Sequence, residues 1–436
     1  MHYSDPDDAE RLSLDSRIRC ADMIAGRQIL LLNYEYPPLG GGAGVATAAL
    51  ARRLAGRGGA VDVVTSSPAD SDRRSPDPRR AASASSDAGP RVFGVRSWRQ
   101  GVHESGLTGA ATYVLSALPL VARLLRERDY DLVHIFFSLP TGLLLPLASL
   151  EGVPTVVSLR GSDVPGYDQR NRRLQRLHRF LLPVTRCIWR SADRVVALGE
   201  ALAEKASATD PGLEMTVIPN GVDTDKFRPE PVSLQTGDEG TVRCIAVARL
   251  VPRKGIDDLL HAWSRLPRGD YCLDVVGDGP DGQRLRSLAG ELGVDDEVSF
   301  TGALEHDELA RRLRQADLFT LAPHSESFGN VFAEALASGV PIVGTRVGGI
   351  PRIVEHGRNG LLVRPGRPAE LAEAIAELGS RPRLRERIAR RNRERAVSDF
   401  TWSEMADDYV NVYDRVLEDR QETASVAAAH PARSTP

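Results

Sequence analysis

The most informative segment of this chain is Pro323-His-Ser-Glu-Ser-Phe-Gly-Asn-Val-Phe-Ala-Glu334, followed by Ala335-Leu-Ala-Ser-Gly-Val-Pro-Ile342. The apolar run Leu318–Ala322 before it predicts a buried strand, and Val331–Ser338 predicts a helix that ends at a glycine. The loop between them therefore lies at the carboxyl end of a strand. In open α/β sheets this is the edge at which ligands bind.

Two kinds of ligand group are expected in this loop. The amides of Phe328, Gly329 and Asn330 begin the helix, so they have no partner within it and point outward. Glu326 and Glu334 lie eight positions apart on either side and could face the same crevice. Carboxylates so placed suit polyhydroxyl groups, while the amides suit a phosphate. The alternative, a helix-start acid and a solvated glutamate, remains open.

Length and composition limit the class of protein. A chain of 436 residues is too long for one ordinary core, so two or three domains are expected. Its 42% hydrophobic and 26% charged content is typical of a soluble globular protein. A net charge of −3 gives no overall basic field, which argues against nucleic acid as a partner.

The termini and cysteines indicate a cellular location. The four cysteines show no Cys-x-x-Cys spacing and are interpreted as free thiols in a reducing compartment. The first twenty or so residues are polar and charged, unlike a signal peptide, and no run reaches about 18 uninterrupted apolar residues. We expect a cytoplasmic protein, with peripheral contact at the inner membrane surface as an option.

Strands alternate with helices along the whole chain, which predicts parallel sheets with right-handed crossovers. The expected strands of the first half are 28–33, 61–65, 92–95, 132–137, 154–159, 194–198 and 215–218. Those of the second half are 242–248, 273–276, 298–300, 318–322, 341–343 and 360–363. The predicted fold class is therefore α/β, with two Rossmann-like domains facing each other across a deep cleft.

Composition also sets the domain boundaries. Two Rossmann-like domains are expected at 27–227 and 241–398, joined by a proline-containing linker at 228–240, with a final helix at 399–420 that returns to the first domain. Polar segments without apolar periodicity are expected to be disordered at 1–26, at an insertion 66–89, and at the tail 421–436.

Two further loops suit a diphosphate. Gly40–Gly44 follows the first strand, so the amides of Gly41 and Gly42 can approach a ligand closely at a helix start. Arg249 and Lys254 follow the strand 242–248, at the same end of the sheet as Glu326, where fixed cations can stabilise a leaving phosphate. A flexible turn and a solvated basic turn are the alternatives.

Residues 170–182 form a predicted basic amphipathic helix, because arginines alternate with leucines at helical spacing. Such a helix suits an anionic membrane surface or a lipid-phosphate acceptor. An ordinary solvated helix explains the same pattern, and both interpretations remain open.

Two other motifs are weaker. Gly277-Asp-Gly-Pro-Asp-Gly282 matches a dinucleotide fingerprint, but it follows the second strand of its domain and the next strand ends without an acid for a ribose. A nicotinamide or flavin enzyme is therefore disfavoured. Asp223-Thr-Asp225 resembles a metal-binding pair, but turn chemistry explains it better, and no metal site is predicted.

Taken together, these motifs give the region Gln28–Leu417 a family resemblance. It is similar to the retaining glycosyltransferases of family 4 (glycosyl transferases group 1), which have the GT-B fold. The motifs that carry the resemblance are the Gly40–Gly44 loop, Val217-Ile-Pro-Asn-Gly-Val-Asp223, Arg249 with Lys254, Val276–Pro280, Glu326-x7-Glu334 and Val347-Gly-Gly-Ile-Pro351.

The resemblance implies a role for each matching residue. Arg249 and Lys254 would bind the diphosphate of a UDP- or GDP-linked sugar, Glu334 the ribose, and Glu326 a hydroxyl of the transferred sugar. Amides at Gly41, Gly42, Phe328, Gly329 and Asn330 would complete the donor site. The acceptor, a glycan, a lipid-linked molecule or a small molecule, would bind the first domain. Transfer would retain the anomeric configuration and need no metal or other cofactor.

One position departs from the family pattern. Many relatives carry His-Gly after the strand 154–159, whereas this chain has Arg160-Gly161. An arginine cannot accept a proton, so Arg160 is assigned to the catalytic set for charge stabilisation only. The expected activity is glycosyl transfer from a nucleotide sugar. A GT-B nucleotide-sugar epimerase and a non-catalytic sugar-nucleotide-binding protein are the alternatives.

Overall fold

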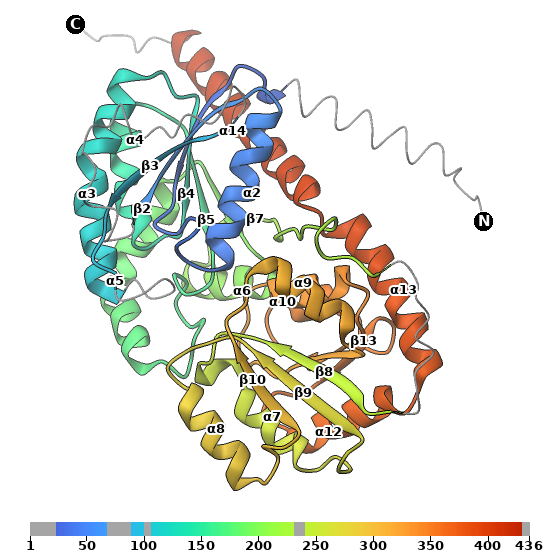
Figure 1. The fold of residues 1–436 in the computed structure, drawn as a ribbon. Coiled ribbons are helices and arrows are strands. Elements are labelled where there is room, and N and C mark those ends of the chain that lie inside the picture. The colour runs from blue at the N-terminus through green and yellow to red at the C-terminus, as the bar shows by residue number, and fades with distance from the viewer. Residues whose placement is uncertain (1–22, 68–88, 100–105, 231–239, 430–436) are drawn as a thin grey trace, which may run out of the picture.

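The computed structural model describes residues 23–67, 89–99, 106–230 and 240–429. Most of the segments expected to be disordered, namely 1–22, 68–88 and 430–436, lie outside the described residues, as do 231–239 of the linker. The described part consists of two parallel sheets, each covered by helices, with the first domain above the second in Figure 1.

The first sheet has seven parallel strands in the order β3-β2-β1-β4-β5-β6-β7. Its strands are β1 (Gln28–Leu32), β2 (Ala60–Ser67), β3 (Arg91–Arg96), β4 (Leu132–Phe136), β5 (Thr155–Leu159), β6 (Arg194–Ala197) and β7 (Met215–Val217). The central strands β4 and β5 are buried along their whole length. Strands buried on both faces are near-continuous apolar runs, which is why the sequence pattern located them.

The helices of the first domain cover both faces of that sheet. The helical segments are α2 (Gly42–Gly56), α3 (Gly106–Glu127), η2 (Thr141–Leu144), α4 (Leu145–Leu150), α5 (Arg172–Ser191) and α6 (Glu200–Thr209). The connection through α2 moves toward the β3 edge of the sheet, whereas those through α3 to α6 move toward the β7 edge. Right-handed crossovers therefore place α2 on one face and α3 to α6 on the other.

The second sheet has six parallel strands in the order β10-β9-β8-β11-β12-β13. They are β8 (Val242–Val247), β9 (Tyr271–Val276), β10 (Val298–Gly302), β11 (Leu318–Leu321), β12 (Ile342–Thr345) and β13 (Gly360–Val363). The helical segments are η3 (Pro252–Lys254), α7 (Ile256–Trp263), α8 (Gly282–Glu291), α9 (His306–Gln315), α10 (Asn330–Ala337), α11 (Ile350–Ile353), α12 (Pro368–Gly379) and α13 (Pro382–Asp399). The prediction of an α/β chain with two Rossmann-like domains is confirmed.

The last helix, α14 (Trp402–Ala429), leaves the second domain and packs against α2 of the first (Figure 1). Its start lies beside the exit of the first domain, because the amide of Val222 donates to Phe400 O at 2.7 Å. Two tyrosines of α14 are then buried against β4 and β5. Tyr413 Oη lies 2.6 Å from His134 Nδ1, and Tyr409 Oη lies 2.9 Å from Ser158 Oγ.

The structure corrects the expected boundaries of three segments. The predicted disorder at 1–26 is wrong for residues 23–26, because Ile24 is 3% exposed and packs in the core. Residues 66–67, assigned to the disordered insertion, belong to β2. The helix α14 runs to Ala429, so residues 421–429 are helical instead of a disordered tail. Their alanines favour helix even without an apolar stripe.

The helix α3 has no run of 18 uninterrupted apolar residues, because Thr108, Thr112 and Ser116 interrupt it. By length and average composition alone, it is nevertheless long and apolar enough to cross a membrane. In the structure it lies on the first sheet, with Tyr113, Ala117 and Val121 buried in the core. The side that contacts the sheet therefore explains only part of its apolar character.

We expect Tyr413→Phe to lower the free energy of unfolding of the first domain by about 1–3 kcal/mol, because it leaves buried His134 Nδ1 without its hydrogen-bond partner. Urea unfolding of the full chain, followed by circular dichroism, measures this. Glu418→Gln, at an exposed position of the same helix, is the control. Equal stability of Tyr413→Phe and the control would show that the His134–Tyr413 contact adds nothing.

Candidate active site

The centre of the site is an ion pair between Lys254 and Glu326. Lys254 ends the short helix η3 after β8, and Glu326 lies in the loop after β11, the neighbouring strand. Lys254 Nζ donates to Glu326 Oε2, and the two side chains are only 12% and 11% exposed. The sequence placed both residues at one end of the sheet, and the structure brings them into direct contact.

A glycine makes this contact possible. Gly255 has φ 65°, and a Cβ at this position would lie 1.8 Å from Ala322 O. The turn after Lys254 therefore packs directly on the end of β11, which only glycine permits. A second glycine acts on the other side, because a Cβ on Gly348 would lie 1.6 Å from Glu326 O. The Val347–Pro351 motif thus supports the backbone of Glu326.

The surroundings keep the pair charged. Burial by itself would raise the pKa of Glu326, but Lys254 and then Arg253 outweigh it and hold that pKa below its usual value. Burial lowers the pKa of Lys254, and Glu326 opposes this shift in part. A carboxylate with a lowered pKa is ionised at neutral pH, so Glu326 is available as a hydrogen-bond acceptor.

Two arginines lie in the same loop as Lys254, after β8. Arg249 is two residues past the end of the strand and is half-buried. Arg253, which sequence reasoning passed over, has a buried Nη1 without a hydrogen-bond partner among the described residues. Its position next to Lys254 in the sequence was the available signal. A buried guanidinium nitrogen without a partner indicates a place for an anionic ligand.

The start of α10 supplies free amides beside the ion pair. Gly329 precedes the helix with φ 99°, and Asn330 is its first residue. Within the described part of the chain, no hydrogen bond leads from the amides of Phe328, Gly329 or Asn330 to another residue. Phe328 is buried and its ring contacts Phe400, which fixes the loop. These amides are therefore free to bind a ligand at the helix start where the sequence predicts a phosphate.

Glu334 lies one turn into α10 with a buried Oε2 that has no hydrogen-bond partner in the described structure. Burial raises its pKa to about 7. A carboxylate oxygen left unpaired in the interior is costly, unless a ligand donates to it. Ribose hydroxyls are donors of the required kind, so the geometry fits the role that the resemblance implies for Glu334.

The glycine loop of the first domain faces Asn330 across the cleft. A Cβ on Gly42 would lie 2.5 Å from Asn330 Nδ2, so the backbone of the loop lies close to that side chain. The amide of Gly41 donates to Glu35 Oε2 at 3.1 Å. Gly42 is therefore brought to the site, while the amide of Gly41 has a partner within its own loop.

Arg160 joins the two domains through neutral polar groups. Its Nη2 donates to Asn220 Oδ1 at 2.7 Å, and Asn220 Nδ2 donates to Asn330 Oδ1 at 2.9 Å. The side chain is buried, contacts the ring of Phe136 and also hydrogen-bonds Tyr409 of α14. Burial lowers its pKa from the usual high value. Arg160 is thus linked through Asn220 to Asn330 at the start of α10, and its described contacts are with protein groups.

Asp163 and Ser327 are site residues that sequence reasoning did not assign. Asp163 is buried and accepts hydrogen bonds from the amides of Ser138, Arg160 and Gly161, so it fixes the ends of β4 and β5. Burial raises its pKa, against the effect of those amides. A Cβ on Gly161 would lie 2.1 Å from Ser327 Oγ. These contacts between loops had no signature in the sequence.

A pocket of about 320 Å³ opens between the domains next to the ion pair. The first domain contributes Tyr167–Arg170 and the start of α6, and the second contributes Arg253, His324–Ser327 and Val347–Gly348. Both domains therefore line a cavity that contains Glu326, as expected for a site that joins a donor to an acceptor.

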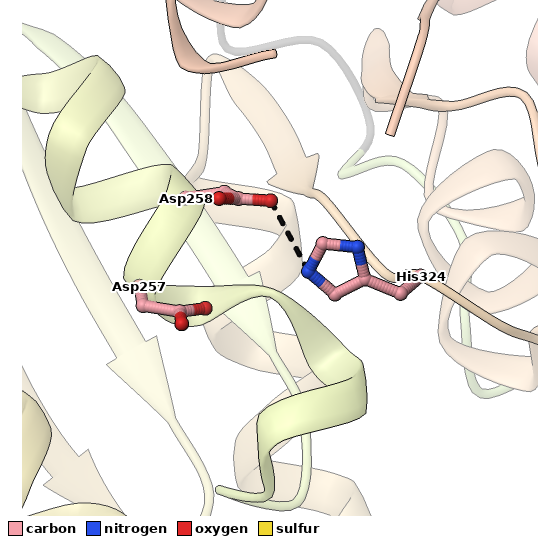
Figure 2. Close-up of side chains that lie close together, drawn as sticks. All are labelled: Asp257, Asp258 and His324. Carbon is pink, nitrogen blue, oxygen red and sulfur yellow. Dashed lines mark ion pairs between the residues drawn. The ribbon is translucent and has the colours of Figure 1, made fainter. Parts of the chain in front are cut away.

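His324 lies at the edge of this pocket, close to Asp257 and Asp258 on the first turn of α7 (Figure 2). Its Nε2 is 3.2 Å from Asp258 Oδ2, and its Nδ1 is 3.2 Å from Arg170 Nη2. The three ligand atoms are near enough to hold a metal ion. Because both ring nitrogens already have protein partners, we assign the cluster to contact between the domains.

The two weaker motifs have structural explanations. A Cβ on Gly277 would lie 1.9 Å from Ala248 O, and one on Gly279 would lie 2.4 Å from Leu250 O. These glycines allow close packing under the loop that carries Arg249. Asp223 Oδ1 accepts from the amides of Asp225 and Lys226, which is a turn.

Comparison with known proteins agrees with this geometry. The family model for glycosyltransferase family 4 matches residues 40–226, and that for glycosyl transferases group 1 matches residues 235–395. The chain is 34% identical to the GDP-mannose-dependent alpha-(1-6)-phosphatidylinositol monomannoside mannosyltransferase of Mycobacterium tuberculosis, over 59% of this chain and 68% of that protein.

Other relatives extend over more of the chain. The D-inositol 3-phosphate glycosyltransferase of Acidothermus cellulolyticus is 31% identical over 90% of both chains. Among solved structures, the sucrose-phosphate synthase from Thermosynechococcus elongatus superposes with a TM-score of 0.77 at 23% identity, covering 90% of this chain and all of that one. From the two family models, these relatives and the shared two-domain GT-B fold, we conclude that the chain is a glycosyltransferase and belongs to glycosyltransferase family 4.

Proposed function

We propose that this glycosyltransferase takes its sugar from a UDP- or GDP-linked donor and transfers it with retained configuration, without a metal ion. The observation that carries the proposal is the group formed by the Lys254–Glu326 ion pair, the free amides before α10 and the unpartnered oxygen of Glu334. The diphosphate, the ribose and the transferred sugar each have a matching group within this set.

The parts divide as follows. Lys254, with Arg249 and Arg253 beside it, and the amides of Phe328–Asn330 bind the diphosphate. Glu334 accepts hydrogen bonds from the ribose. Glu326, held ionised by Lys254, accepts from a hydroxyl of the sugar. These cations and amides supply the charge stabilisation for which other transferases use a metal ion.

The acceptor hydroxyl must lose a proton to a base. We assign this role to the leaving phosphate of the donor. Arg160 stands where many relatives carry histidine and cannot accept a proton. Asp163 is occupied by three backbone amides. In the proposed step the bond from the anomeric carbon to the phosphate breaks, and the acceptor oxygen bonds to that carbon on the same face. Its proton passes to the departing phosphate oxygen, which accounts for retention.

The relatives support the choice of substrate class. The names of those described above indicate mannosyl transfer from GDP-mannose and glycosyl transfer to an inositol phosphate. Both are named for transfer to an acceptor, which favours transfer over epimerisation or silent binding. We therefore place GDP-mannose first among the UDP- and GDP-linked donors, and lipid-linked, glycan or small-molecule acceptors with free hydroxyls as the partners.

The test is a donor screen in EDTA. Purified protein is incubated with UDP- and GDP-sugars, and binding is followed by calorimetry and nucleotide release by chromatography. We expect one nucleotide family to bind and to turn over equally well in EDTA and in Mg²⁺ or Mn²⁺. Activity that disappears in EDTA and returns with a divalent ion would refute metal independence, and binding of none of the donors would refute the donor site.

Removing the central cation should abolish most of the activity. Lys254→Met deletes a donor to the leaving diphosphate and leaves Glu326 buried without its partner, which should lower kcat/KM on the order of 100-fold. Lys226→Ala is the matched control, because Lys226 forms an exposed ion pair with Asp307 and does not contact Glu326. Comparable losses in the two variants would contradict the proposed role of Lys254.

Donor affinity should depend on pH through Glu334. Because burial raises its pKa to about 7, half of the molecules carry a protonated Glu334 near neutrality, and only the carboxylate accepts two ribose hydroxyls. The Kd of the donor should therefore fall about tenfold from pH 6 to pH 8 and then level off. Calorimetry at fixed ionic strength measures this, and Glu334→Gln should bind weakly with little pH dependence. An unchanged pH profile in Glu334→Gln would exclude Glu334 as the titrating group.

A further inference from the structure

The outer face of the first domain carries several large apolar side chains that are exposed to solvent. It comprises Leu107, Leu115 and Leu118 of α3, Leu143 of η2, Leu150 of α4 and Phe180 of α5. Phe180 is 81% exposed, Leu115 71% and Leu107 70%. We call these six residues the apolar outer face. Large apolar side chains grouped in this way usually mark a surface that contacts another molecule.

The six residues lie on one side of the molecule. The helices α3 to α6 cover the same face of the first sheet, as the crossover directions require. The segment η2 packs on α3, and Ile188 of α5 lies within 2.9 Å of a Cβ built on Gly142 of η2. In Figure 1, α3 and α4 form the outer flank of the domain, away from α2 and α14.

The helix α3 has an apolar side that no other element of the described chain covers. Residues 107–122 contain no charged side chain, although α3 lies at the surface. One side of the helix is accounted for by Tyr113, Ala117 and Val121 against the sheet. The opposite side presents Leu107, Leu115 and Leu118, at helical spacing. A helix that is apolar all round is normally covered on both sides.

Positive charge lies beside the apolar outer face, which favours a partner with negative charge. Residues 169–192 contain seven arginines and no acid. Arg190 pairs with Asp210, and Arg186 donates to Thr209 O. The four at the start of α5, namely Arg172, Arg173, Arg176 and Arg179, are exposed and form no ion pair with a described residue.

The structure also shows which side of α5 faces outward. Leu174, Leu177 and Leu181, the leucines that made the sequence look amphipathic, are half-buried against the domain, and His178 is buried between them. The outward side carries the arginines and Phe180. The apolar part of a docking surface therefore comes from Phe180 and α3, and the positive part from α5.

We propose that the apolar outer face and the α5 arginines together dock the first domain on an anionic lipid bilayer. Leucine and phenylalanine side chains enter the boundary between headgroups and acyl chains, while the arginines lie against the lipid phosphates. The loop Tyr167–Arg170, which leads into α5, lines the pocket that contains Glu326. Docking on this face therefore brings the pocket close to the bilayer, where a lipid-linked acceptor would be presented.

The test is sedimentation of the full chain with vesicles of phosphatidylglycerol and phosphatidylcholine, compared with phosphatidylcholine alone. No donor or acceptor is added, so the outcome does not depend on the proposed enzymatic function. We expect binding to the anionic vesicles, little binding to neutral ones, and release as the salt concentration rises. Equal binding to both vesicles, or to neither, would overturn the proposal.

The charge component is tested with a triple substitution, Arg172→Gln, Arg173→Gln and Arg176→Gln. Each arginine near an anionic surface contributes about fivefold, so the partition coefficient should fall on the order of 100-fold. The matched control changes three exposed arginines of α13, Arg383→Gln, Arg387→Gln and Arg390→Gln, with the same change in net charge. Similar losses from the two triple variants would refute docking through α5.

The apolar component is tested with Leu115→Ser and Phe180→Ser, each expected to weaken binding by roughly tenfold. Val397→Ser, at an exposed apolar position on α13, is the control and should bind like the unchanged protein. All these side chains are exposed, so the variants should fold, which thermal unfolding checks. A wild-type dimer that Leu115→Ser converts to a monomer, without vesicle binding, would assign the face to a second copy of the chain.

Discussion

The buried ion pair between Lys254 and Glu326 is the interaction on which the site depends. Two charges removed from water in this way are favourable only if each has its partner and the geometry is fixed. That requirement brings the loops after two neighbouring strands, β8 and β11, into direct contact. It also holds the pKa of Glu326 below its usual value, beside the free amides at the start of α10, so one interaction sets both the charge and the shape of the loop after β11.

Glycines hold this arrangement together by close backbone contact. Gly255 and Gly348 each meet a carbonyl oxygen of the β11 region at a distance that leaves no room for a Cβ. Gly42 and Gly161 of the first domain also lie close to the second domain, where they meet the side chains of Asn330 and Ser327. Close contacts between the loop backbones therefore set the shape of the site.

The C-terminal helix gives the two domains a shared core. Through Tyr413, Ser158 and Tyr409, α14 is hydrogen-bonded to β4 and β5 of the first domain, although the preceding helix α13 belongs to the second. Arg160 extends from the end of β5 to Asn220 and from there to Asn330 of the second domain. The buried guanidinium of Arg160 is therefore part of the contact between the domains. On the outer flank of the first domain, α3 and the start of α5 combine exposed apolar side chains with arginines that form no ion pair with a described residue.

The sequence by itself determined the fold class, the strand order along the chain and most of the donor loop. Apolar runs without alternation identified strands buried on both faces, and the spacing of Glu326 and Glu334 placed both acids around one helix start. Only the tertiary structure decided which groups meet. The contact of Arg253 and Ser327 with the pocket, the network from Asp163 and the unpartnered oxygen of Glu334 depend on loops distant in sequence. The sequence also could not show that the α5 arginines face outward. The periodicity of a helix defines two faces, but it does not say which one the sheet covers.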